Sequence, residues 1–192
     1  MKTIRQLVTI LVILACAIPA AASRLETVKV ESESMHKQIN VSVVLPDSYG
    51  ARPLPVVYLL HGYGDNNLCG YLSYTNVRQY ADMFDVVLVI PDGGTNWYFD
   101  SPVDPTIRYE TFVSSELIKY IDKNYLTDAR RERRAVTGLS MGGHGALYLA
   151  IRHQDVFGAA GSMSGGVDFR PFPEKWDIKL RLGDQKTHKE NW

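Results

Sequence analysis

Hydrophobic and polar positions alternate in the first part of the chain and then give way to continuous apolar runs. Alternation with period two over residues 27–31 and 38–43 predicts two half-exposed strands, and the short turn between them predicts an antiparallel pair. Residues 56–60 and 86–90 are continuously apolar, which is typical of strands buried on both faces of a parallel sheet. Two further strands are predicted at residues 134–137 and 157–163.

Helical segments separate these later strands. Apolar residues at helical intervals predict a helix over residues 112–125, and residues 142–153 are predicted to form a second one. Strands that alternate with helices predict an α/β fold, in which a mostly parallel sheet carries helices on both faces. The length of 192 residues fits one domain with a sizeable buried core.

The first 22 residues differ from the rest of the chain. Lys2 and Arg5 give a short positive start, residues 7–18 are almost wholly apolar, and residues 20–22 are three alanines. This is the three-part plan of a secretory signal peptide, and we expect cleavage after Ala22. The apolar run is shorter than the roughly 20 residues that a membrane-spanning helix needs, so no stable membrane span is expected.

The sequence therefore predicts a signal peptide at residues 1–22, a folded domain at residues 23–192, and a secreted or periplasmic location. Two alternatives remain. One is a buried N-terminal helix. The other is a lipoprotein anchor on Cys16, against which the bulky Leu14 argues, because lipoprotein signals usually carry a small residue there.

Charge, cysteine content and the absence of binding motifs give no reason to expect several classes of partner and cofactor. The formal net charge is zero, which gives no electrostatic reason to expect nucleic acid or an anionic membrane as partner. Cleavage after Ala22 would leave Cys69 as the only cysteine, so no internal disulfide is expected. No cluster of cysteine and histidine has zinc-binding spacing, and no phosphate-binding loop is present, so we expect neither metal nor cofactor.

A serine lies in the pattern of a nucleophile elbow. Residues 138–142 fit G-x-S-x-G, with a predicted strand before them and a predicted helix after them. In this arrangement the glycines allow a tight turn that lifts the Ser140 side chain above the sheet edge. The same turn directs the backbone N–H of Met141 at the negatively charged oxygen that develops on the substrate. The pattern therefore predicts Ser140 as a nucleophile and Met141 as an oxyanion donor.

A second pattern is independent of the first. Residues 61–64 read His-Gly-Tyr-Gly and directly follow the apolar strand at residues 56–60. A loop of this kind supplies the other oxyanion N–H in lipases and esterases. We assign that N–H to Tyr63, with Gly62 as the alternate, while His61 has the alternative of a packed structural histidine.

Several runs recur in an order that resembles a known family. They are residues 59–64, 91–93, 97–98 with 100–102, 116–118 and 138–146. Over roughly residues 41–192 the chain resembles the esterase family of α/β-hydrolases. That family includes esterase D (S-formylglutathione hydrolase), tributyrin esterases, feruloyl and acetyl xylan esterases, and mycolyltransferases. The resemblance implies an α/β-hydrolase fold, with Ser140 as nucleophile and Tyr63 and Met141 as oxyanion donors.

The chain departs from the family pattern after the serine. In the family, the catalytic acid and histidine follow later strands, whereas here 52 residues follow Ser140. We therefore expect the esterase domain to be incomplete at its C-terminus, without the last strands and helices and without the acid and histidine of the triad. Asp168 and His188 have the required order, but no strand is predicted between them to fix the histidine beside Ser140.

Other candidate residues have weaker signals. Trp97 and Tyr98 follow an apolar strand and are predicted to line an acyl or sugar pocket, with core packing as an equal alternative. His144, four residues along the helix from Ser140, is predicted to face away from the hydroxyl as a structural residue. His153 is read as structural or solvated at the helix end, and Asp92 as a turn-former.

Together these patterns predict an exported serine carboxylesterase that acts through an acyl-Ser140 intermediate. Its substrate is expected to be a small-molecule or polysaccharide ester, such as an acetylated or feruloylated polysaccharide. One alternative is an acyltransferase with a sugar acceptor. Another is a non-catalytic carbohydrate-binding pseudo-enzyme.

Overall fold

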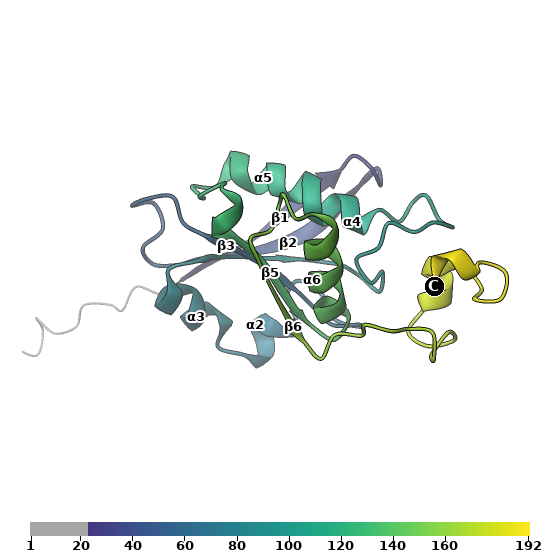
Figure 1. Cartoon of the computed structure of the whole chain (residues 1–192). Helices are drawn as coiled ribbons and strands as arrows, with labels where there is room; N and C mark the ends of the chain where they lie inside the picture. The colour runs from purple at the N-terminus through teal and green to yellow at the C-terminus, as the bar shows by residue number, and fades with distance from the viewer. Residues whose placement is uncertain (1–22) are drawn as a thin grey trace, which may run out of the picture.

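The computed structural model describes residues 23–192, so the predicted signal peptide lies outside the described residues. The described part is built on a six-stranded sheet with the strand order β1-β2-β4-β3-β5-β6. Helices cover both faces of this sheet, with α3 on the face opposite to α5 and α6 (Figure 1). The α/β fold class predicted from the sequence is confirmed.

Six strands form where six were predicted. They are β1 Arg24–Ser32, β2 Lys37–Leu45, β3 Val56–Leu60, β4 Val87–Pro91, β5 Arg134–Leu139 and β6 Ala159–Met163. Strands β1, β2 and β4 are antiparallel neighbours, whereas β4, β3, β5 and β6 run parallel. Strand β6 is an edge strand of the described sheet, and four of its five residues are exposed.

The helices agree less closely with the prediction. They are α2 Tyr71–Tyr74, α3 Val77–Phe84, α4 Tyr109–Thr111, a π-helical turn Phe112–Glu116, α5 Leu117–Asn124, α6 Met141–Arg152 and α7 Ile178–Leu182. Helix α6 lies where it was predicted. The predicted helix at residues 112–125 is part of a longer helical segment, 109–124, whose middle is a π-helical turn. Helices α2, α3 and α7 had not been predicted.

The core consists of two apolar layers, one on each face of the sheet. In β3, Tyr58 and Leu60 are buried in the larger layer, which α5 and α6 cover. Leu59 points to the other face, where it packs in the smaller layer with Val77 and Ala81 of α3. Because successive side chains of a strand point to opposite faces, a strand covered on both sides must be apolar at every position. This explains the continuous apolar runs.

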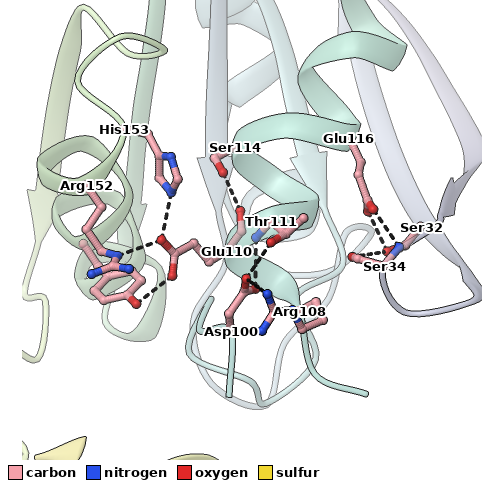
Figure 2. Close-up of polar contacts among 11 residues, drawn as sticks. Ser32, Ser34, Asp100, Arg108, Glu110, Thr111, Ser114, Glu116, Arg152 and His153 are labelled. Carbon is pink, nitrogen blue, oxygen red and sulfur yellow. Dashed lines mark hydrogen bonds and ion pairs between the residues drawn. The ribbon is translucent and has the colours of Figure 1, made fainter. Parts of the chain in front are cut away.

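A buried carboxylate joins α4 to the end of α6 (Figure 2). Glu110 Oε1 accepts hydrogen bonds from Arg152 Nε at 2.7 Å and His153 Nε2 at 2.8 Å, and Oε2 accepts one from Tyr148 Oη at 2.7 Å. Burial raises the pKa of Glu110, but the hydrogen bonds from these three side chains outweigh it and the pKa is lowered. His153 is therefore a partner of Glu110.

The same helical segment holds two other parts of the chain (Figure 2). Asp100 accepts hydrogen bonds from the backbone N–H and the hydroxyl of Thr111, at 3.0 and 2.5 Å. Glu116, in the π-helical turn, accepts from Ser32 Oγ at 2.6 Å and from the Ser34 N–H at 2.8 Å. These contacts fix the segment after β4 and the turn between β1 and β2.

Replacing Glu110 by glutamine is expected to lower the free energy of unfolding by about 1–3 kcal/mol, because an amide group at this buried position cannot accept at both of its atoms from three donors. Urea denaturation followed by circular dichroism measures this change. Glu132→Gln is the control: Glu132 is exposed and lies 3.9 Å from Arg131, so its loss is expected to cost less than about 0.5 kcal/mol. Equal stabilities of the two variants would contradict the assigned role.

Candidate active site

Ser140 occupies the turn between β5 and α6 in a strained backbone conformation. Its φ is 56° and its ψ is −114°, in a region that residues other than glycine rarely adopt. Such a conformation costs about 1–3 kcal/mol and persists when its surroundings hold it. Two hydrogen bonds do so here: Ser140 N donates to Met163 O at 2.8 Å, and His144 N donates to Ser140 O at 3.0 Å.

The glycines of the elbow allow it to pack against the end of β3. A Cβ atom added to Gly138 or to Gly142 would collide with the carbonyl oxygen of Leu60. Neither position can carry a side chain without moving the backbone. The turn therefore lies directly against the point where β3 ends and the loop at residues 61–64 begins.

His61 holds that loop from inside the protein. Its ring is fully buried, and the Gly93 N–H donates a hydrogen bond to Nε2 at 2.8 Å. Nε2 is thus the acceptor, and the ring proton lies on Nδ1, which donates to Gly62 O at 2.8 Å. The Tyr98 hydroxyl donates to the carbonyl of His61 at 3.2 Å. His61 thus has a packed structural position, and it ties the loop to the turn that follows β4.

The loop and the elbow are neighbours. The position of a Cβ on Gly62 lies 3.5 Å from Leu139 O and 3.8 Å from Ser140 Cβ. Met141 is the first residue of α6, so its N–H is one of the N-terminal amides that the helix itself leaves without a partner. These contacts bring the two segments that were predicted to supply oxyanion donors together at Ser140.

Ser140 opens into a cavity of about 290 Å³. The residues that line it are Tyr63, Trp97, Ser140, Ser164, Gly166 and Trp176. Three of the six are aromatic, and none has an imidazole or a carboxylate. Ser164, Gly166 and Trp176 were not predicted, because nothing in the pattern of the segment after β6 indicates that it returns to Ser140.

Trp97 and Tyr98 were predicted together, but the structure places them in different surroundings. Trp97 lines the cavity, whereas Tyr98 is fully buried and its ring lies against Gly93 and Gly145. Tyr98 takes the core position that was its alternative. Asp92 accepts a hydrogen bond from the Gly94 N–H at 3.0 Å, as a turn-forming residue does.

The wall formed by Trp97 and Trp176 contains two pairs of residues in the left-handed region. Trp97 and Tyr98 have φ of 56° and 60°, and Trp176 and Asp177 have φ of 53° and 58°. Trp97 Nε1 donates to Trp176 O at 2.9 Å, which joins the two pairs. Tyr63 Oη donates to Asp177 Oδ2 at 2.9 Å. The segment around α7 is thus attached to both sides of the cavity.

The two residues considered for a compressed triad lie apart from the cavity lining. Asp168 is exposed and pairs with Arg170, with 2.8 Å between Oδ1 and Nε. His188 Nδ1 lies 2.9 Å from Thr187 Oγ1. Within residues 23–192, no histidine lines the cavity of Ser140.

No group of three or more potential metal ligands occurs among residues 23–192. In the same part of the chain, no helix has both the length and the apolar character needed to cross a membrane.

His144 is buried beneath the cavity. Its Nδ1 lies 2.9 Å from Gly166 O, and its ring contacts four aromatic side chains: Trp97, Phe99, Tyr148 and Phe169. Among the described residues, its buried Nε2 has no hydrogen-bond partner. Burial lowers the pKa of His144 to about 4, against an ordinary value of 6.5, although the hydrogen bond to Gly166 acts in the opposite direction.

This pKa gives the stability a pH dependence. In the unfolded chain His144 takes up a proton near its ordinary pKa of 6.5, whereas in the folded protein it does so near 4. The contribution of neutral His144 to the free energy of unfolding is fully present above pH 6.5 and is lost as the pH falls towards 4. It amounts to about 3 kcal/mol. His144→Asn removes the titrating group. The unfolding free energy of this variant should therefore fall less than that of the wild-type protein between pH 6.5 and pH 4. Parallel urea titrations of both proteins test this, and identical slopes would contradict it.

Comparison with known proteins identifies the family. Residues 32–192 match the family model described as Putative esterase. The chain belongs to this esterase family. The family membership inferred from the ordered sequence motifs is thereby confirmed.

Three curated relatives illustrate the range of this family. Esterase Rv1288 of Mycobacterium tuberculosis is 36% identical over 135 residues, which cover 68% of this chain and 30% of the relative. The endo-1,4-beta-xylanase/feruloyl esterase of Xylanibacter ruminicola is 35% identical over 71% of this chain and 21% of its own length. The diacylglycerol acyltransferase/mycolyltransferase Ag85B of Mycobacterium leprae is 32% identical over 85% of this chain and 51% of its own length. This chain thus spans at most about half the length of these relatives.

Solved structures agree on the fold. A ferulic acid esterase superposes with a TM-score of 0.71 at 29% identity, over 89% of this chain and 69% of the other. An S-formylglutathione hydrolase from Agrobacterium tumefaciens superposes with a TM-score of 0.76 at 21% identity, over 90% of this chain and 69% of the hydrolase. The fold is that of the α/β-hydrolases.

Proposed function

We propose that the protein is a serine carboxylesterase that forms an acyl intermediate on Ser140. The observation that carries this proposal is the strained turn of Ser140, packed against the loop at residues 61–64 and open to a cavity of about 290 Å³. Membership of the esterase family supports the same reaction type.

The proposed reaction has two stages. The Ser140 hydroxyl oxygen attacks the carbonyl carbon of the ester, and the N–H groups of Tyr63 and Met141, with Gly62 as the alternate to Tyr63, stabilise the oxyanion. Donors of this kind contribute about 3–4 kcal/mol each to catalysis. Collapse of the tetrahedral intermediate expels the alcohol, and water then cleaves the acyl-Ser140 ester. The serine proton requires a base, which in this type of mechanism is a histidine oriented by an acid. No described residue is assigned either role.

The cavity favours an aromatic acyl group. Tyr63, Trp97 and Trp176 line it, and aromatic rings prefer the edge and face contacts that a flat ring can make. A feruloyl ester fits this chemistry, and two of the similar proteins are named as a feruloyl esterase and a ferulic acid esterase. An acetyl ester, the other candidate, would leave most of these aromatic surfaces without contact. The alcohol side of the substrate is proposed to be a polysaccharide.

Export is proposed as well. It rests on the sequence of residues 1–22, and the contacts of Ser23 are compatible with it. Ser23 N lies 3.1 Å from Asp82 Oδ2, so the amino group created by cleavage after Ala22 would lie beside a carboxylate. Mass spectrometry of the protein recovered from the periplasm or the medium would then give Ser23 as the first residue, and retention of residues 1–22 would contradict export by cleavage.

Two other functions have specific support. Acyl transfer to a sugar is suggested by the similarity to Ag85B, and product analysis with and without a sugar acceptor separates it from hydrolysis. A non-catalytic carbohydrate-binding role is suggested because no histidine of residues 23–192 lines the Ser140 cavity. Binding of the polysaccharide by a natural protein that hydrolyses no ester would favour that role.

Ser140→Ala in the natural protein is expected to reduce hydrolysis of methyl ferulate and 4-nitrophenyl acetate by at least about 10³-fold, because it removes the attacking oxygen. Initial rates measured by absorbance test this. Ser115→Ala is the control, since Ser115 lies in the π-helical turn and not at the cavity. A Ser140→Ala protein with wild-type rates would rule out the acyl-Ser140 intermediate.

A further inference from the structure

We propose that His144 is a positioning residue, which sets the shape of the Ser140 cavity by holding two of its walls and takes no part in proton transfer. This inference rests on the proposed function and extends it to a residue outside the cavity lining. It follows from the hydrogen bond of His144, from its aromatic surroundings and from its place on α6.

The hydrogen bond holds the first wall. Gly166 lines the cavity, and its carbonyl oxygen lies 2.9 Å from His144 Nδ1. A carbonyl oxygen accepts and cannot donate, so the ring proton is on Nδ1. His144 is only 9% exposed, and a buried hydrogen bond of this kind is costly to lose because it leaves the carbonyl unsatisfied. His144 thus determines where the backbone of Gly166 lies.

Ring contacts hold the second wall. The rings of Trp97 and His144 meet in a T-shaped contact, with 5.6 Å between centroids and 70° between planes. Phe99 and Phe169 contact the same ring at 5.1 and 4.7 Å, and Tyr148 stacks on it at 5.5 Å. Trp97 lines the cavity, so one imidazole supports both its aromatic wall and its Gly166 wall.

The place of His144 on α6 relates these walls to the nucleophile. Its backbone N–H donates to Ser140 O at 3.0 Å, and Ser140 N donates to Met163 O at 2.8 Å. A Cβ on Gly143 would lie 2.8 Å from Met163 O and 3.0 Å from Gly165 Cα, so the first turn of α6 and the segment after β6 are in close contact. The side chain of His144 continues this contact as far as Gly166.

The same geometry argues against His144 as the base for Ser140. Its Nε2, the nitrogen free to accept a proton, is buried, and the ring lies among aromatic side chains and is not among the residues that line the cavity of Ser140. A base must reach the serine hydroxyl within about 3 Å or through one water molecule. The role that its contacts support is therefore structural and specific to the cavity.

Two substitutions separate the hydrogen bond from the ring. His144→Phe keeps an aromatic ring but removes the donor, whereas His144→Asn keeps an amide donor near the position of Nδ1. In the natural protein, His144→Phe is expected to raise KM for methyl ferulate roughly tenfold, because the Gly166 wall of the cavity is no longer held in the shape that binds the acyl group. The value of kcat should change by less than about threefold, because the oxyanion donors are untouched. His144→Asn should show only a small part of this rise in KM, because it keeps the donor to Gly166.

Leu149→Ala is the matched control for a general loss of stability. Leu149 is fully buried on the same helix and belongs to the main core. Its substitution should lower Tm at least as much as His144→Phe but leave KM unchanged. An unchanged KM in His144→Phe, or an equal rise in Leu149→Ala, would overturn the proposal.

A measurement without turnover separates this inference from the proposed function. Hydrogen–deuterium exchange in His144→Phe should accelerate in peptides covering residues 164–169, and the same peptides should be unaffected in Leu149→Ala. Acceleration in an inactive protein would support the positioning role and contradict the esterase. Unchanged exchange at residues 164–169 would contradict the positioning role even in an active enzyme.

Discussion

The close approach of the Ser140 turn to the carbonyl end of β3 is the constraint on which the site depends. Two glycines, Gly138 and Gly142, allow the turn to lie against the carbonyl oxygen of Leu60, where any side chain would collide. That contact places the start of α6 beside the loop at residues 61–64, and the strained conformation of Ser140 is its local cost. The buried ring of His61 then fixes the loop from the opposite side. Ser140, the proposed nucleophile, and the proposed oxyanion donors are therefore positioned by backbone packing.

The helical segment at residues 109–124 has a comparable role for the surrounding scaffold. Its acidic and hydroxyl side chains reach the end of α6, the segment after β4 and the turn between β1 and β2. Glu110, Thr111 and Glu116 do this from positions that are close in the sequence. A π-helical turn begins directly after Thr111 and ends at Glu116, and such turns are frequent at functional sites of proteins. The segment fixes Asp100, and thereby the end of the strained segment that contains Trp97.

The sequence predicted the parts of the molecule that depend on local pattern. Strands β3 and β4 were found because burial on both faces requires apolar residues throughout, β1 and β2 because their polar and apolar residues alternate, and the Ser140 turn because glycine is needed on either side of it. The contribution of Gly166 and Trp176 to the cavity was not predicted, since it depends on how the chain returns after β6. The sequence also could not show which of Trp97 and Tyr98 lines the cavity and which packs in the core. Their backbones are both left-handed, so the alternation that distinguishes neighbours in a strand does not apply to them. The partners of Glu110 lie 38–43 residues away and carry no local signal.

The two left-handed pairs, Trp97–Tyr98 and Trp176–Asp177, form two walls of the cavity that differ in how they are held by the rest of the domain. The first pair is anchored in the core by Tyr98, so its shape is tied to the stability of the whole domain. In the second pair Trp176 is 45% exposed, and the pair accepts two side-chain hydrogen bonds, from Trp97 Nε1 and from the Tyr63 hydroxyl. A change at residue 176 or 177 therefore alters the cavity without disturbing the sheet or α6. Within one fold, the selectivity of the proposed acyl cavity can therefore diverge on this side while the surroundings of Ser140 stay constant.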